Sequence, residues 1–191
     1  MAAYRPRRQI HCDTKRPAAD YILASHLNGN DTMKIDPQTD LQLERVIHAP
    51  RALVWACWTT PEHIKHFFIP RPHRVVSCDI DLRVGGRFNT VFDVDGNEMR
   101  NEGVWLEIVP QQILVFTDGY REGWKPAEDP FLTALLMLED VGADSTRYTA
   151  IARHRSPEAR QRHEEMGFFT GWGIVVDQLE EYASTLPPVK G

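Results

Sequence analysis

The chain has 191 residues, of which 42% are hydrophobic, so it is long enough for one domain with a sizeable core. Its formal net charge of -5 gives no basic excess for nucleic acid or an anionic membrane surface. The three cysteines, Cys12, Cys57 and Cys78, form no CxxC pair, which argues against a disulfide framework or zinc ribbon and suits a reducing compartment. No apolar run approaches the ~18 residues of a membrane helix, so we expect a cytoplasmic protein without membrane insertion.

The first 32 residues differ from the rest of the chain. They are rich in basic residues, show little apolar periodicity and lack the apolar core of a secretory signal. We expect a disordered or weakly ordered leader over 1–40, or sequence upstream of a true start at Met33. A targeting peptide is the alternative, although the acidic residues count against it. The folded domain is expected over 41–186 and a tail over 187–191.

The domain opens with a predicted strand and two short helices. The stretch LQLERVIHA (41–49) is rich in β-formers, and RALVWACWTT (51–60) has helical apolar spacing. A second helix, PEHIKHFF (61–68), can start with Pro61 at its first position, where the missing N–H costs nothing. Two prolines follow and end it.

A run of predicted strands follows. Asp95-Gly96 carries the signal of a tight hairpin, and Gly85-Gly86 reads as a turn or bulge where glycine supplies positive φ. A polar loop is expected over 121–130. Because the segments are closely spaced and mostly hairpin-linked, they indicate a meandering antiparallel sheet. The strands are expected at residues 73–82, 87–94, 98–109, 112–120, 131–140 and 146–154.

One long helix is predicted from Ser156 to Leu186. Ser156 is a suitable cap and Pro157 a suitable first residue. At ~100° per residue, the apolar side chains of its C-terminal part fall within an arc of roughly 140°, as expected for a helix docked on a core. These are Phe168, Phe169, Trp172, Val175, Val176, Leu179, Tyr182, Ala183 and Leu186.

Three glycines flank this apolar arc: Gly167 and Gly171 beyond one edge and Gly173 beyond the other. We interpret them as positions where neighbouring backbone comes close to the helix. In the first turns the same arc holds polar residues, which either are solvated or line the mouth of a cavity between helix and sheet. These polar residues are Glu158, Gln161 and Glu165.

Four blocks, in order, carry a family resemblance: LERVIHAPRALVWACWTTPEHIKHFF, DLRVGGRF, NEGVWLEIVPQQILVFTDGY and HEEMGFFTGWGIVVDQLEEY. They resemble the family related to the activator of the heat-shock protein 90 ATPase, within the START and birch-allergen-like helix-grip superfamily (SRPBCC). The resemblance implies an α+β helix-grip fold, in which a curved antiparallel sheet of about seven strands wraps around a long C-terminal helix. It also implies two short helices after the first strand and an apolar cavity under the long helix.

The resemblance says less about activity. Members of the superfamily include lipid carriers, hormone receptors, aromatic cyclases and proteins with no assigned role. Eukaryotic activators resemble this chain only through their C-terminal domain, whereas a separate N-terminal domain contributes chaperone binding. About 40 residues precede the first predicted strand here. They are too few for that domain, so we do not expect a chaperone contact.

Several catalytic and metal-binding motifs are absent from the sequence. HEEMG (163–167) is not HExxH, no GxSxG elbow occurs, and no GxGxxG follows Gly85. His63 and His66 are spaced to share a helical face, but a metal site needs a third ligand from elsewhere. We therefore expect no metal and no cofactor.

The candidate ligand-binding residues are mainly aromatic. On the predicted strand around 99–107, alternation places Asn101, Gly103 and Trp105 on one face, which suits a ligand-lining surface. The full set that we expect to bind the ligand is His66, Phe68, Phe88, Asn101, Trp105, Phe116, Glu165, Phe169 and Trp172.

These residues predict a protein that binds a small hydrophobic or aromatic molecule, with a carrier, sensor or stress-related role. The first alternative is a polyketide cyclase- or hydrolase-like enzyme, in which His66, Asn101, Glu102 and Glu165 serve as acid, base or orienting groups. An acid–base group with a perturbed pKa deep in the cavity would favour it. The second alternative is a chaperone-interacting protein. A homodimer is left open.

Overall fold

The computed structural model describes residues 34–187, and the folded unit within it begins at Asp36. The predictions for the leader before residue 34 and for the last four residues of the tail lie outside this range. The helices and strands are β1 (Asp40–Ile47), α2 (Arg51–Thr59), α3 (Pro61–Ile64), β2 (Arg74–Ile80), β3 (Phe88–Val94), β4 (Asn97–Asn101), β5 (Val104–Val109), β6 (Ile113–Thr117), β7 (Tyr120–Arg121), β8 (Lys125–Pro126), β9 (Thr133–Asp140), β10 (Thr146–Arg153), α4 (Pro157–Glu165) and α5 (Phe168–Ala183).

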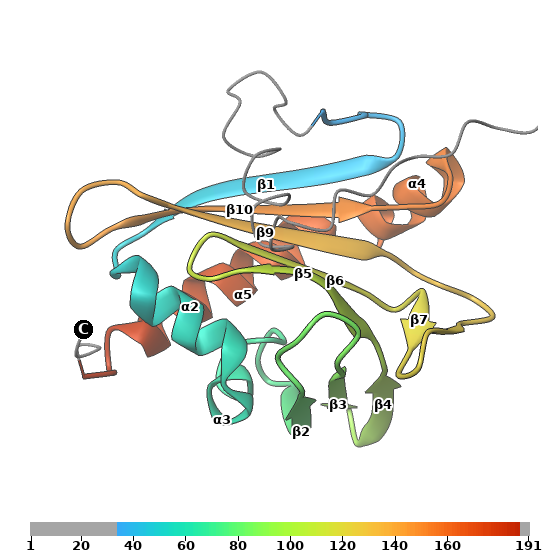
Figure 1. The fold of residues 1–191 in the computed structure, drawn as a ribbon, viewed down its shortest axis with the longest axis horizontal. Helices are drawn as coiled ribbons and strands as arrows, with labels where there is room; N and C mark the ends of the chain where they lie inside the picture. Colours follow the sequence, from blue (N-terminus) through green and yellow to red (C-terminus); the bar gives the residue numbers. More distant parts are fainter. Residues whose placement is uncertain (1–33, 188–191) are drawn as a thin grey trace, which may run out of the picture. The chain divides into compact units, whose positions relative to one another are not determined.

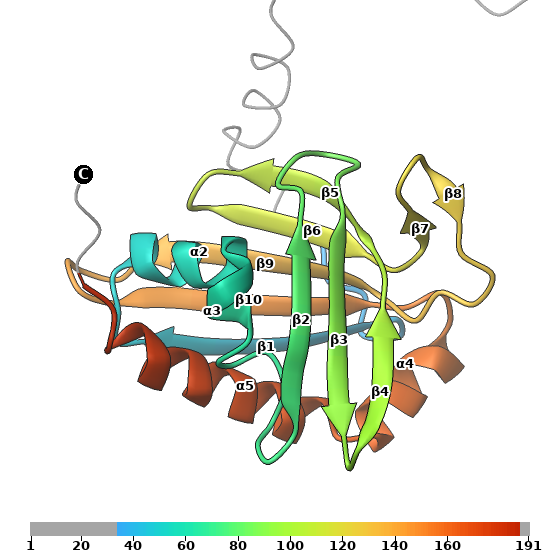
Figure 2. The ribbon, with the colours of Figure 1, turned by 90° about the horizontal axis from the view of Figure 1, so that it is seen from below.

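The strands form two main antiparallel sheets. The larger has the order β1-β10-β9-β6-β5, and the smaller has the order β2-β3-β4. Figure 2 shows the strands of the smaller sheet running across the direction of the larger one. The α+β helix-grip prediction is confirmed. The expected polar loop over 121–130, however, contains one strand of the small β7–β8 hairpin.

One predicted strand, 98–109, is in fact two strands in different sheets, β4 and β5. The chain passes between them at Gly103, which is buried. A Cβ on Gly103 would lie 2.5 Å from the carbonyl oxygen of Thr117. Only glycine lets the backbone approach β6 this closely. A bridge between Arg87 and Val104 continues the contact between the two sheets.

The helices α2, α3 and α5 lie on the same side of the larger sheet (Figure 1), and α5 packs against β1 and α2. At the centre of the core Trp58 is fully buried and stacks on Tyr148. Burying such side chains supplies most of the favourable free energy of folding, at about 25 cal/mol per Å² of apolar surface. The second helix stops at Ile64, four residues before the predicted end, and turns follow it.

The predicted single C-terminal helix is broken into α4 and α5. Gly167 separates them with a φ of +96°, in the left-handed region that favours glycine. The N-terminal cap is as predicted, since the Ser156 hydroxyl accepts from the backbone N–H of Ala159 at 3.3 Å. The interpretation of the flanking glycines is wrong. A Cβ on Gly167, Gly171 or Gly173 would meet nothing within 4 Å, so no backbone approaches there.

The two predicted turns adopt the expected backbone. Gly85 has a φ of +76°, and Asp95 and Gly96 have φ values of 53° and 84°. Two consecutive positive φ values are those of the type I′ hairpin turn, which Asp-Gly favours. This turn joins β3 to β4, so it sets the register of the strand that ends at Asn101.

Candidate ligand cavity

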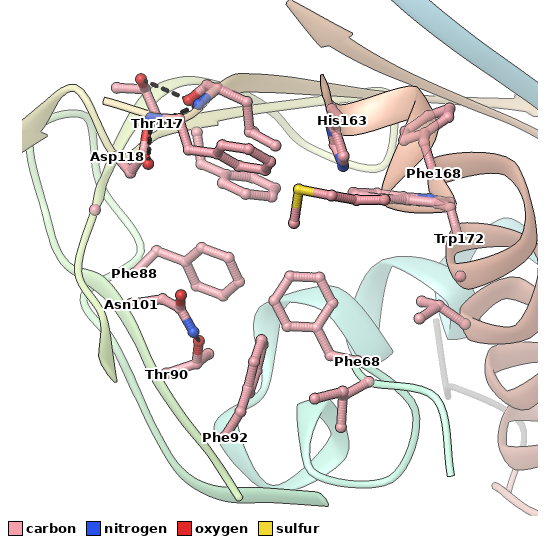
Figure 3. A pocket seen from close by; sticks show the side chains of 18 of the residues that line it. Phe68, Phe88, Thr90, Phe92, Asn101, Thr117, Asp118, His163, Phe168 and Trp172 are labelled. Carbon is pink, nitrogen blue, oxygen red and sulfur yellow. Dashed lines mark hydrogen bonds between the residues drawn. The ribbon is translucent and has the colours of Figure 1, made fainter. Parts of the chain in front are cut away.

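A cavity of about 350 Å³ lies between the helices α4 and α5, the strands β3, β4 and β6, and the loop after α3 (Figure 3). This volume is within the range of small-molecule sites, roughly 300–1,000 Å³. Figure 3 shows Phe88, Thr90 and Asn101 on one side of the cavity and Phe168 and Trp172 on the other. Elements far apart in the sequence therefore build one concave site.

Aromatic rings form most of the cavity wall. The ring of Phe68 lies 5.7 Å from that of Phe88, 5.8 Å from Phe92 and 6.4 Å from Phe116, measured between centroids. Trp172 closes the opposite side and donates its indole N–H to the hydroxyl of Tyr148 at 3.2 Å. Tilted and edge-to-face pairs of this kind add to the free energy of simple burial. This part of the wall is therefore apolar and is held by contacts between rings.

A single buried side chain of α5 holds Phe68 in this wall. The amide nitrogen of Gln178 donates to the carbonyl oxygens of Phe67 at 2.9 Å and Ile69 at 2.8 Å. Its amide oxygen accepts from the backbone N–H of Arg71 at 3.0 Å. The loop lacks regular backbone pairing, so Gln178 supplies the partners that its buried polar groups require.

Polar groups at one end of the cavity are already bonded to the backbone. The Asp118 carboxylate accepts from the N–H groups of Phe131 at 2.8 Å and Leu132 at 3.0 Å. The Thr117 hydroxyl donates to the carbonyl of Leu132 and accepts from the N–H of Gly119. These side chains shape the loop between β6 and β9. On the same side of the cavity (Figure 3), the Asn101 amide donates to the Thr90 hydroxyl at 3.4 Å.

A histidine pair lies beside the cavity, and one of its members, His163, lines it. Nδ1 of His163, on α4, lies 2.8 Å from Nε2 of His154, and the His163 ring also packs against Phe131 and Phe168. Burial, and secondarily the neighbouring His154, lowers the pKa of His163 to about 4. The imidazole of His163 is therefore neutral near pH 7.

The cavity opens beside the break between α4 and α5. Met166 lines the cavity and is 73% exposed, and Phe131 lines it and is 40% exposed. Large apolar side chains in contact with both water and the cavity mark its mouth. Within residues 34–187 no three His, Cys, Asp or Glu side chains gather where they could hold a metal ion.

The sequence pattern of the family described as "Activator of Hsp90 ATPase homolog 1-like protein" matches residues 48–184. The chain belongs to this family. Among solved structures, it is similar to protein NE0264 from Nitrosomonas europaea, with 40% identity over 78% of this chain and 97% of that one, at a TM-score of 0.76. No curated protein matches the chain.

Solved structures with lower sequence identity share the fold alone with this chain. A protein from Arthrobacter aurescens shares 23% identity over 82% of this chain and 92% of its own, at a TM-score of 0.66. Protein Ms6760 from Mycobacterium smegmatis shares 23% identity over 81% and 97%, also at 0.66. None of the helices within residues 34–187 is both long and apolar enough to cross a membrane.

Five of the nine residues proposed from the sequence line the cavity. These are Phe68, Phe88, Asn101, Phe116 and Trp172. They come from the loop after α3, from β3, β4 and β6, and from α5, and the fold brings them around one space.

The other four residues lie elsewhere. His66 stacks on Tyr182 at 4.2 Å between ring centroids, away from the cavity. Trp105 is fully buried behind the wall, against Phe88 and Phe116, because β5 belongs to the other sheet from Asn101. The placement of Glu165 and Phe169 assumed a continuous helix, and the break at Gly167 invalidates it. Glu165 is exposed and bonded to Gln161, and Phe169 is 46% exposed.

Sequence reasoning missed His163, Met166, Thr90 and Asp118. The break at Gly167 changes which face of α4 meets the cavity. His163 therefore lines the cavity, whereas a continuous helix would have directed Glu158, Gln161 and Glu165 toward it. The one available signal was Gly167 itself, since a glycine between two helical stretches is typical of a left-handed end of a helix.

Proposed function

We propose that the protein binds one small hydrophobic or aromatic molecule in this cavity, as a carrier or sensor. The observation that supports the proposal is the aromatic wall around Phe68, Phe88, Phe92 and Trp172, which encloses about 350 Å³. Such a space is costly to leave filled with water, and transfer of an apolar ligand into it is favoured by about 25 cal/mol per Å². The family pattern and the fold support the same role.

Native mass spectrometry of the protein purified from its own host tests the proposal. We expect a stoichiometric apolar passenger that denaturing extraction releases. Two matched variants locate it. Gly171 lines the cavity and Gly173 does not, yet a Cβ on either meets no neighbouring atom within 4 Å. Gly171→Leu should exclude the passenger and Gly173→Leu should retain it. An empty wild-type protein, or equal occupancy in both variants, would contradict the proposal.

A second candidate, a cyclase- or hydrolase-like enzyme using the same cavity, is favoured by one observation. His163 is an acid–base group in the cavity with a pKa lowered to about 4. It is unprotonated at neutral pH, but a base with so low a pKa contributes little, because catalysis is best when the pKa lies near the working pH. The enzyme candidate predicts that the extracted passenger is converted to a new product on incubation with protein. The chaperone-interacting alternative rests on the family description alone.

A further inference from the structure

The histidine pair beside the cavity has a definite order of donors and acceptors. The backbone carbonyl of Thr39 lies 2.9 Å from Nδ1 of His154 and also accepts from the backbone N–H of that residue at 3.0 Å. A carbonyl oxygen can only accept, so Nδ1 of His154 carries the proton. In the neutral ring Nε2 of His154 is then an acceptor.

The second histidine follows from the first. Nδ1 of His163 lies 2.8 Å from Nε2 of His154 and therefore donates to it. With its proton on Nδ1, the neutral His163 ring has a lone pair on Nε2. The lowered pKa of His163 keeps the ring in this neutral form. The carbonyl of Thr39 thus fixes the tautomers of both rings through a chain of two hydrogen bonds.

The lone pair on Nε2 of His163 is available to a ligand. The ring extends from α4 toward the cavity (Figure 3), and the bond to His154 occupies its other nitrogen. Within the described residues no hydrogen bond is made by Nε2 of His163, and the rings of Phe131 and Phe168 are its other neighbours. An acceptor in apolar surroundings binds a donor more strongly than it does in water.

Two other polar groups that line the cavity are already engaged by the backbone. Both Asp118 oxygens and the Thr117 hydroxyl are held by backbone groups of the loop before β9. The cavity therefore combines an aromatic wall with an acceptor of fixed position near its mouth, where Met166 is exposed.

We propose that the ligand is an aromatic molecule with one hydroxyl or N–H donor, such as a phenol, whose donor bonds to Nε2 of His163 while its ring lies among Phe68, Phe88 and Phe92. This inference rests on the proposed binding function and names the chemical class that the cavity takes. His154 is a positioning residue in it, because it acts on the ligand only through His163.

Three probes of similar size test the class: 2-naphthol, 2-methoxynaphthalene and naphthalene, titrated into the full chain by calorimetry or tryptophan fluorescence. We expect 2-naphthol to bind about tenfold more tightly than the other two, the equivalent of one hydrogen bond. Equal affinities would overturn the donor inference and leave the binding function standing. If none of the three binds, the proposed function and the inference both fail.

Two variants place the donor site. His163→Phe should reduce the preference for 2-naphthol over 2-methoxynaphthalene to about one. His66→Phe, a histidine outside the cavity, should keep the wild-type preference. A preference that survives in His163→Phe would overturn the assignment of the donor to Nε2.

A measurement on the unaltered chain covers the case in which the His163→Phe variant does not fold. Long-range ¹H–¹⁵N correlation of the imidazoles reports which ring nitrogen is protonated. We expect Nδ1–H and a bare Nε2 for His163, with the Nε2 signal shifting when 2-naphthol is added. A proton on Nε2 of His163 in the free protein, or no shift on saturation, would overturn the inference.

Discussion

Gly103 is a buried position where an added methyl group would meet backbone atoms of a neighbouring strand. It joins the two sheets, and a Cβ there would lie 2.5 Å from the Thr117 oxygen and 3.2 Å from the Thr117 carbonyl carbon. Both neighbours are backbone atoms of β6, which is paired with β5 on one side and β9 on the other. Gly103→Ala therefore has no flexible side chain to displace.

The magnitude follows from the distance that must be recovered. A contact of 2.5 Å falls about 0.9 Å short of ordinary van der Waals separation, so the sheet junction has to shift. Overpacking of buried sites typically costs about 1–3 kcal/mol and occasionally more. At roughly 2–4 °C per kcal/mol for a domain of this size, we expect the melting temperature to fall by about 2–12 °C.

Gly171→Ala is the matched control, because the same methyl group there meets nothing within 4 Å. Replacing glycine by alanine inside α5 should stabilise the protein by about 0.5–1 kcal/mol through helix propensity. Differential scanning calorimetry of the two variants beside the wild type gives the comparison. A wild-type melting temperature for Gly103→Ala, or a lower one for Gly171→Ala than for Gly103→Ala, would refute the geometric reasoning.

Three further predictions concern single side chains. Gln178→Leu leaves three backbone groups of the Phe68 loop without partners and should cost about 2–4 kcal/mol in thermal unfolding, whereas an unchanged melting temperature would show that the loop holds itself. Burial raises the pKa of Cys57 to about 12, so iodoacetamide should modify Cys57 only when denaturant unfolds the chain; modification at native conditions would contradict this. His163 has a pKa of about 4 in the folded chain against 6.5 for the free side chain, so between these pH values the unfolded chain binds more protons than the folded one. The free energy of unfolding should therefore fall, by at most about 3 kcal/mol, as the pH drops from 6.5 to 4. His154 faces that ring, Phe131 and Phe168 cover it, and His163→Gln should flatten the same pH profile; a profile as steep as that of the wild type would exclude His163 as the cause.

Regular stretches of this chain were predictable because their signals are local. The apolar runs Ala134–Leu138 and Tyr148–Ala152 mark β9 and β10, Asp95-Gly96 marks the hairpin between β3 and β4, and Ser156-Pro157 marks the start of α4. Each of these signals extends over a few residues, so the structure that it predicts does not depend on the arrangement of the rest of the chain. Phe68, Phe88, Phe116 and Trp172 were found in the same way, as large apolar side chains on elements that face a shared interior.

The errors all arise where the chain leaves regular geometry. The assignment of Trp105 to the ligand-lining face assumed that alternation continues from Asn101, but the chain changes sheets at Gly103. The pairing of β5 with β6 is also irregular between Trp105 and Glu107, which shifts the alternation again. Alternation assigns side chains to the two faces of a sheet only within one regular strand, so it fails where a residue is inserted or where the chain passes to another sheet.

The break at Gly167 had the largest effect on the functional site. Glycine reaches a φ of +96° at little cost, whereas an L-residue there loses about 1–2 kcal/mol. A Cβ at this position would meet no atom within 4 Å, so the preference for glycine is conformational and does not come from close packing. A straight helix would have presented a different face of α4 to the cavity and withdrawn His163 from it. One backbone angle thus decides whether a histidine acceptor lines the cavity beside its aromatic wall.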